Sequence, residues 1–190
     1  MIIIQKTAWL FLPVCLLTAA MACHNPARQQ DSKDVANDKN EGRFDSKDQE
    51  KNASFAVQAV AGFYESLQLA ELAHQKSGRP EVKQMADSLK ENYAPLLERF
   101  KTFAAAANIS LPANEGKDAR DDYSKLAALP PQQFDKQWCE LLMEKHKKAI
   151  ASYESIASAA GGDTLQQLVV DALPALRRQY DMLMQYHHKL

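Results

Sequence analysis

The sequence lacks the features that nucleic-acid binding requires. Its 23 Lys and Arg residues nearly balance 24 Asp and Glu residues, which leaves a formal net charge of −1. Affinity for nucleic acid rests on clustered basic side chains, and no basic stripe with interleaved aromatics occurs along the chain. We therefore predict that nucleic acid is not a partner.

Cysteine and glycine are also scarce, with three and six residues respectively. Cys15 and Cys23 fall in or directly after an N-terminal leader, so Cys139 is left without a disulfide partner. Cys139 has no flanking histidine to activate it, and we expect a small buried residue rather than a nucleophile. Gly161-Gly162 is not followed by the Lys-Ser/Thr of a phosphate-binding loop and instead predicts a helix end.

The N-terminus reads as an export signal. Residues 1–22 contain Lys6, an apolar stretch and the small-residue sequence Ala20-Met21-Ala22, which is typical of a signal peptide with its cleavage site. The next residue is Cys23, and a lipoprotein signal peptidase requires cysteine at this position. Leu is usual three residues before that cysteine, whereas Ala20 stands here. We predict lipidation of Cys23, with secretion of a protein bearing a free N-terminal cysteine as the alternative.

The segment that follows, residues 23–51, mixes charges of both signs with Gln, Asn and Ser and has almost no aliphatic side chains. Such a segment cannot bury enough apolar surface to offset its loss of conformational entropy on ordering. It is predicted to be a disordered tether. The protein would then be a membrane-anchored lipoprotein that faces the periplasm or the cell surface.

Residues 52–190 are predicted to fold as an all-α domain. No window alternates with a period of two, so we expect no strands, and four long segments carry apolar residues at helical spacing. Pro80 suits the first turn of the second segment, and Asp163 can cap the fourth. Short links join the first segment to the second and the third to the fourth, whereas residues 108–129 form a long connection in which a further short helix can lie. The prediction is an antiparallel four-helix bundle of the ferritin-like kind, with up-down-up-down topology as the alternative.

One histidine interrupts an apolar helical stripe. His146 lies where the third segment would carry leucine, and counting inward equally from each helix end places a polar layer around it. Glu65 and Glu91 stand at the margins of this layer as the nearest acidic candidates for a metal site with His146. The layer itself comprises Ser66, Asn92, Tyr93, His146 and Gln179.

These residues fall short of a metal centre. Zinc and iron sites need several imidazoles or carboxylates that converge on one point, and the layer has one imidazole. Glu71 and His74 have the Glu-x-x-His spacing of di-iron bundles, but those sites need two such motifs. We therefore predict no cofactor and no metal, and a buried His146 that forms a hydrogen bond with a hydroxyl or amide group near Tyr93 or Gln179.

The chain resembles a bacterial family of unknown function that is labelled predicted outer-membrane protein and has a ferritin-like helical bundle. The resemblance covers residues 55–184 and is carried by "FAVQAVAGFYESLQLAELA", "RPEVKQMADSLKENY", "FDKQWCELLMEKHKKAI" and "DALPALRRQY". It implies a polar cluster of Glu, two Asp-His pairs and a late His. In this chain the corresponding positions are Ser66, Asn92-Tyr93, Lys145-His146 and Gln179, so that only His146 keeps the family's residue type.

No catalytic residues are predicted, because the sequence contains no nucleophile–base pair and no paired carboxylates on one stripe. The expected function is that of a non-enzymatic envelope protein whose domain binds a protein partner or stabilises a surface structure. One alternative is a ferritin-like metal-binding or stress protein. The other is a carrier of a small apolar ligand between the helices, suggested by the small residues of "FAAAAN" and by Pro95 and Pro174 inside two of the helical segments.

Overall fold

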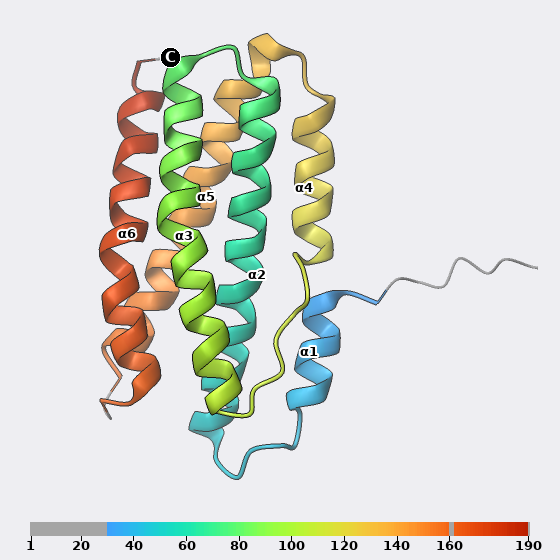
Figure 1. Ribbon diagram of the computed structural model, residues 1–190, viewed down its shortest axis with the longest axis vertical. Coiled ribbons are helices and arrows are strands. Elements are labelled where there is room, and N and C mark those ends of the chain that lie inside the picture. Colours follow the sequence, from blue (N-terminus) through green and yellow to red (C-terminus); the bar gives the residue numbers. More distant parts are fainter. Residues whose placement is uncertain (1–29, 160–161, 190) are drawn as a thin grey trace, which may run out of the picture.

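The computed structural model describes residues 30–159 and 162–189, and this part of the chain is all-helical. Four of its helices have 24 residues or more and run side by side (Figure 1). The order is α1 (Ser32–Asn40), α2 (Lys47–Lys76), α3 (Pro80–Ala106), α4 (Lys117–Ala128), α5 (Pro131–Ala157) and α6 (Thr164–His187). The described residues therefore contain six helices and not only the four long ones predicted: α4 lies in the long connection where a further short helix was expected, and α1 was not predicted.

The long helices begin where the sequence provides start signals. Pro80 and Pro131 occupy the first turns of α3 and α5. Backbone N–H groups in a first turn have no acceptor within the helix, so proline, which lacks an N–H, costs no hydrogen bond there. The side chains of Ser46 and Asp163 accept hydrogen bonds from the backbone N–H groups of Gln49 and Gln166, which caps α2 and α6. Helices α3 and α6 continue through the internal Pro95 and Pro174.

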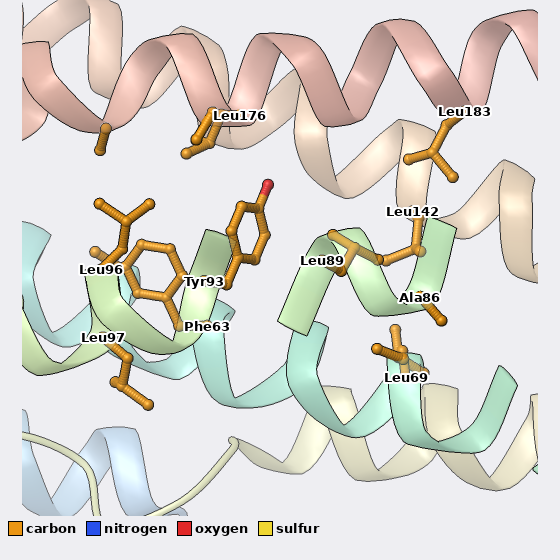
Figure 2. Packing of buried hydrophobic residues seen from close by; sticks show 14 of the residues in the cluster. Phe63, Leu69, Ala86, Leu89, Tyr93, Leu96, Leu97, Leu142, Leu176 and Leu183 are labelled. Carbon is orange, nitrogen blue, oxygen red and sulfur yellow. The ribbon is translucent and has the colours of Figure 1, made fainter. Parts of the chain in front are cut away.

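The main core lies between the two pairs of long helices, α2 with α3 and α5 with α6. Figure 2 shows its leucines together with Phe63 and Tyr93, which fill the space between the helix layers. At one level Trp138 of α5 is fully buried and donates its indole N–H to the Leu69 carbonyl of α2 over 2.9 Å. At another, the rings of Phe55 and Tyr153 meet edge to face with centroids 4.9 Å apart. Helix α4 packs on α2 and α5 at the side of this core.

The structure differs from the predicted tether over residues 30–51. Helix α1 and the first turn of α2 occupy part of this range, so the helical domain begins before residue 52. Helix α1 buries little apolar surface, chiefly Ala36, and is held instead by hydrogen bonds to the segment before α4. The Asn40 side chain donates to the Ser110 carbonyl (2.8 Å) and accepts from the Ser110 N–H (2.7 Å). Hydrogen bonds to the backbone thus hold α1 on the domain, although the segment has few apolar side chains to bury.

Two further contacts attach the start of α1 to the same segment. The Ser32 hydroxyl accepts from the Ala113 N–H at 2.8 Å, and the Asp31 carboxylate accepts from the Lys117 N–H. The leader, Cys23 and the remainder of the predicted tether lie outside the described residues. Within the described residues, no helix combines the length and the hydropathy that crossing a bilayer demands.

We predict that Asn40→Ala weakens the attachment of α1. The change removes two hydrogen bonds and leaves the backbone N–H and C=O of Ser110 without their partners, which costs about 1–3 kcal/mol. Hydrogen exchange of the amides in α1 should accelerate, while exchange in α5 and α6 stays slow. Asn37→Ala, on the exposed side of the same helix, is the matched control. Unchanged exchange in α1 of the Asn40 variant would contradict this account of how the segment is held.

Candidate functional site

The buried histidine is joined to a tyrosine of the neighbouring helix pair. His146 of α5 is 3% exposed, and its Nε2 lies 2.6 Å from the hydroxyl of Tyr93 on α3. Its Nδ1 lies 2.7 Å from the Leu142 carbonyl one turn earlier in α5. The two rings are stacked, with centroids 5.8 Å apart and an interplanar angle of 26°. In Figure 2 the Tyr93 ring projects from α3 with its hydroxyl towards the opposite helix layer.

These two contacts fix the proton on the imidazole. A carbonyl oxygen can only accept, so His146 Nδ1 carries the hydrogen and donates it to Leu142. Nε2 of the neutral ring is then an acceptor, and the Tyr93 hydroxyl donates to it. Both nitrogens are occupied, and a metal ion at His146 would have to displace Tyr93.

Burial sets the protonation states of this pair. It lowers the pKa of His146 from 6.5 to about 4, against the opposing effect of the hydrogen bond to Leu142. It also raises the pKa of Tyr93 far above its ordinary value. Imidazole and phenol are therefore both neutral at pH 7, and the proton stays on the tyrosine oxygen.

The other residues of the predicted layer form two separate groups. Gln179 of α6 is 2% exposed and donates to the Ser88 hydroxyl at 2.8 Å. Asn92 also turns to Ser88, donating to its carbonyl at 2.7 Å. Ser66 of α2 instead lines a pocket together with Tyr93 and His146. Sequence reasoning did not identify Ser88, which lies one turn before Asn92 and accepts from two members of the layer.

The candidate acidic ligands lie on different sides of the domain. Glu65 lines the same pocket as His146, whereas Glu91 is exposed and lines a groove between α3 and α6. Glu71 pairs with Lys90 (3.0 Å) and His74 with Asp87 (2.6 Å), so that each has its own partner. Within residues 30–159 and 162–189, no three His, Cys, Asp or Glu side chains are grouped as a metal site requires.

Glu65 belongs to an ion cluster that the sequence did not reveal. Lys145 Nζ of α5 lies 2.8 Å from Glu65 Oε1 of α2 and 2.8 Å from Asp122 Oδ2 of α4. Partial burial acts to lower the pKa of Lys145, but the two carboxylates outweigh it and raise that pKa above its ordinary value. Asp122 could have been found only by placing α4 beside α2 and α5.

The pocket that these residues border lies between α2 and α5. It has a volume of about 210 Å³, with Phe55, Phe63, Tyr153 and Leu176 among its apolar walls. Tyr93 and His146 line its buried side, while Glu65, Ser66, Lys145 and Lys148 are among its polar residues. The pocket is therefore mainly apolar with a small number of polar groups, which is the composition of small-molecule sites in general.

Cys139 is fully buried, as was expected from the sequence. Its thiol donates to the Leu183 carbonyl over 3.2 Å. Burial, aided by the nearby Glu140 charge, raises the pKa of the thiol to about 12. A thiol in this state is not a nucleophile at neutral pH.

We predict that His146 makes the stability of the domain depend on pH. Its pKa is depressed in the folded protein, so between pH 6.5 and about 4 the unfolded chain binds a proton that the folded chain does not. The free energy of unfolding should then fall as the pH is lowered through this window, by about 3 kcal/mol in total, and should not change on this account above it.

Denaturant unfolding at a series of pH values measures this loss. The control is the double variant Tyr93→Phe/His146→Leu, which removes the titrating group and its partner together and leaves no buried hydroxyl unpaired. Carboxylates titrate in both proteins, so the difference between their pH profiles isolates His146. Parallel profiles would show that His146 is not held neutral by burial.

The chain has recognisable relatives in sequence and in fold. Residues 36–186 match the family described as "Domain of unknown function (DUF4142)". No curated protein matches the sequence. A solved structure, that of a DUF305 fragment from Deinococcus radiodurans, is similar with a TM-score of 0.64 and 16% identity, covering 73% of this chain and 96% of that one. This likeness shows the helical fold alone. Because the family match spans most of the sequence, the chain belongs to the DUF4142 family, whose function is unknown.

Proposed function

We propose that the protein is an exported, lipid-anchored binding protein without enzymatic activity, and that its ligand is a small, mainly apolar molecule. The observation that carries the proposal is the pocket of about 210 Å³ between α2 and α5. Its apolar walls and few polar groups suit a bound ligand. In this proposal the four long helices are a ferritin-like bundle whose interior serves binding instead of metal chemistry.

The protonation and hydrogen bonding of Tyr93 and His146 favour ligand binding over acid–base catalysis and over metal binding. Acid–base catalysis needs a group whose pKa lies near the working pH, and the pKa of His146 is about 4. The lone pair of Nε2 is already engaged by the Tyr93 hydroxyl, and this favours a structural histidine over a metal ligand. A protein partner on the outer surface of the domain, the other non-enzymatic role predicted from the sequence, is compatible with a ligand in the pocket.

The proposed location follows from the leader and from Cys23. The signal sequence of residues 1–22 and a lipid on Cys23 would attach the chain to a membrane that faces the periplasm or the cell surface. The family resemblance favours the outer membrane. Because the domain is ordered from α1 onward, only the stretch from residue 23 to residue 31 would separate the anchor from it. That stretch reaches at most about 32 Å when fully extended, so the domain would stay close to the bilayer.

We predict that Cys23→Ser releases the protein from membranes. The wild-type chain should fractionate with the membrane and carry the mass of its acyl groups, whereas the variant should be exported in soluble form. Cys139→Ala is the control: this cysteine is buried inside the domain, and its replacement should leave membrane attachment unchanged. A wild-type chain found free of membranes would contradict the lipid anchor but not the binding site.

We further predict that Ala149→Phe prevents the ligand from binding in the pocket. Ala149 lines it from α5, and a phenyl ring there would occupy the space left for a ligand. Wild-type protein isolated from its own cell envelope should release about one small apolar molecule per chain on organic extraction, detected by mass spectrometry. The variant should release none while keeping its helical circular dichroism. Equal amounts from both proteins would place the ligand elsewhere, and an extract of the wild type without any ligand would refute the binding function.

A further inference from the structure

We infer that Gly62 keeps the pocket between α2 and α5 open, and that the pocket selects a compact, uncharged molecule of about the size of one substituted aromatic ring. This inference rests on the proposed function, since it specifies the ligand of the same site.

Gly62 lies inside α2, where glycine is unfavourable. A glycine in a helix interior costs about 1 kcal/mol relative to alanine. Other glycines of the chain have a conformational reason, since Gly42 and Gly162 both adopt a φ of +64°. At Gly62 a Cβ atom would meet no other group within 4 Å. Neither close packing nor backbone conformation therefore accounts for this glycine.

The space that Gly62 leaves free belongs to the pocket. Gly62 lines it together with Ala59 on the same helix and with Ala149 on α5 across from them. Three residues with no side chain or a single methyl group thus border the opening between two helices that otherwise carry large side chains. A larger residue at position 62 would be accommodated by the protein at the expense of the pocket.

The volume of the pocket sets the size of the group that it can enclose. An apolar protein cavity of about 150 Å³ accommodates benzene. At about 210 Å³, this pocket has room for a single ring with one or two substituents. The aromatic side chains of Phe55, Phe63, Tyr93 and Tyr153 line it, and rings pack favourably on such walls in offset or edge-to-face arrangements.

The charges at the pocket are already paired, and this disfavours a charged ligand. The Lys145 ammonium lies between the carboxylates of Glu65 and Asp122. Lys148, also a lining residue, pairs with Glu144 at 2.5 Å. On the buried side, Tyr93 and His146 satisfy each other. A ligand carboxylate would meet Glu65 and a ligand ammonium would meet Lys145, and either would lose its hydration without a free counter-ion.

Three probes that share one methyl-substituted ring and differ in the charge of its para substituent test this selection: p-cresol, 4-methylbenzoate and 4-methylbenzylammonium, titrated into the mature chain that carries Cys23→Ser. We expect p-cresol to bind saturably with one site per chain, and each charged analogue to bind at least tenfold more weakly. Chemical-shift changes in isotope-labelled protein should centre on the pocket residues of α2 and α5. A charged analogue that binds as tightly as p-cresol would overturn the selection for an uncharged ligand and leave the pocket as a binding site.

Substitutions at Gly62 test its role. Gly62→Leu should abolish p-cresol binding while leaving the unfolding midpoint equal to that of the parent protein or higher, because leucine favours the helix and fills empty space. Gly62→Ala, which adds only a methyl group, should weaken binding without abolishing it. The control is Gly78→Leu, outside the pocket at a position where a Cβ also meets nothing within 4 Å.

The results of these experiments distinguish three claims: the role of Gly62, the class of ligand and the binding function of the pocket. Undiminished p-cresol binding by folded Gly62→Leu protein would overturn the role of Gly62. Failure of all three probes, while a different molecule is extracted from native protein, would overturn the ligand class and leave the binding function intact. Failure of all three probes together with an empty native extract would refute the proposed function itself.

Discussion

The hydrogen bond from Tyr93 to His146 is the constraint around which the interior is arranged. An imidazole with 3% exposure must be neutral and must have a partner for each nitrogen. The Leu142 carbonyl takes the Nδ1 hydrogen, so the second partner has to be a donor on another helix. Tyr93 is that donor, and its hydroxyl joins the helix pair α2–α3 to the pair α5–α6. Phe63 packs edge to face on Tyr93 with centroids 5.4 Å apart, which holds the phenol in place.

The pocket is a consequence of how α2 and α5 meet on either side of this pair. Towards one end, the indole of Trp138 reaches the Leu69 carbonyl and brings the two helices together. Towards the other end, Phe55 and Tyr153 are in ring contact. Between these contacts the facing residues include Gly62 and Ala149, which are too small to close the space. The contacts of large side chains at both ends thus set the spacing of α2 and α5, and the small residues between them leave part of that space open.

The helical class was predictable from the sequence because it depends on local signals: apolar spacing, Pro80 at a first turn and Asp163 as a cap. Counting along helices put Tyr93 and Gln179 at the level of His146, because helix geometry fixes axial position, but only the structure shows that Tyr93 is the one bonded to it. Helix α1 was not predicted because its segment has few apolar residues, and hydropathy was the signal used. It is held instead by hydrogen bonds from side chains to a distant part of the backbone, such as those between Asn40 and Ser110. The contact of Lys145 with Asp122 and the space beside Gly62 depend on lateral packing between helices, which no periodicity encodes.

The composition of the polar layer bears on what this chain can do. A layer with several acids and imidazoles would need counter-ions, protons or a metal to remain buried. Here its members are neutral hydrogen-bonding groups that divide into local pairs: Tyr93 with His146, and Gln179 with Ser88. Each pair satisfies itself, so the layer adds no net charge to the pocket wall. The buried side of the pocket, which Tyr93 and His146 line, is therefore uncharged, and the charged lining residues Glu65, Lys145 and Lys148 each lie in an ion pair.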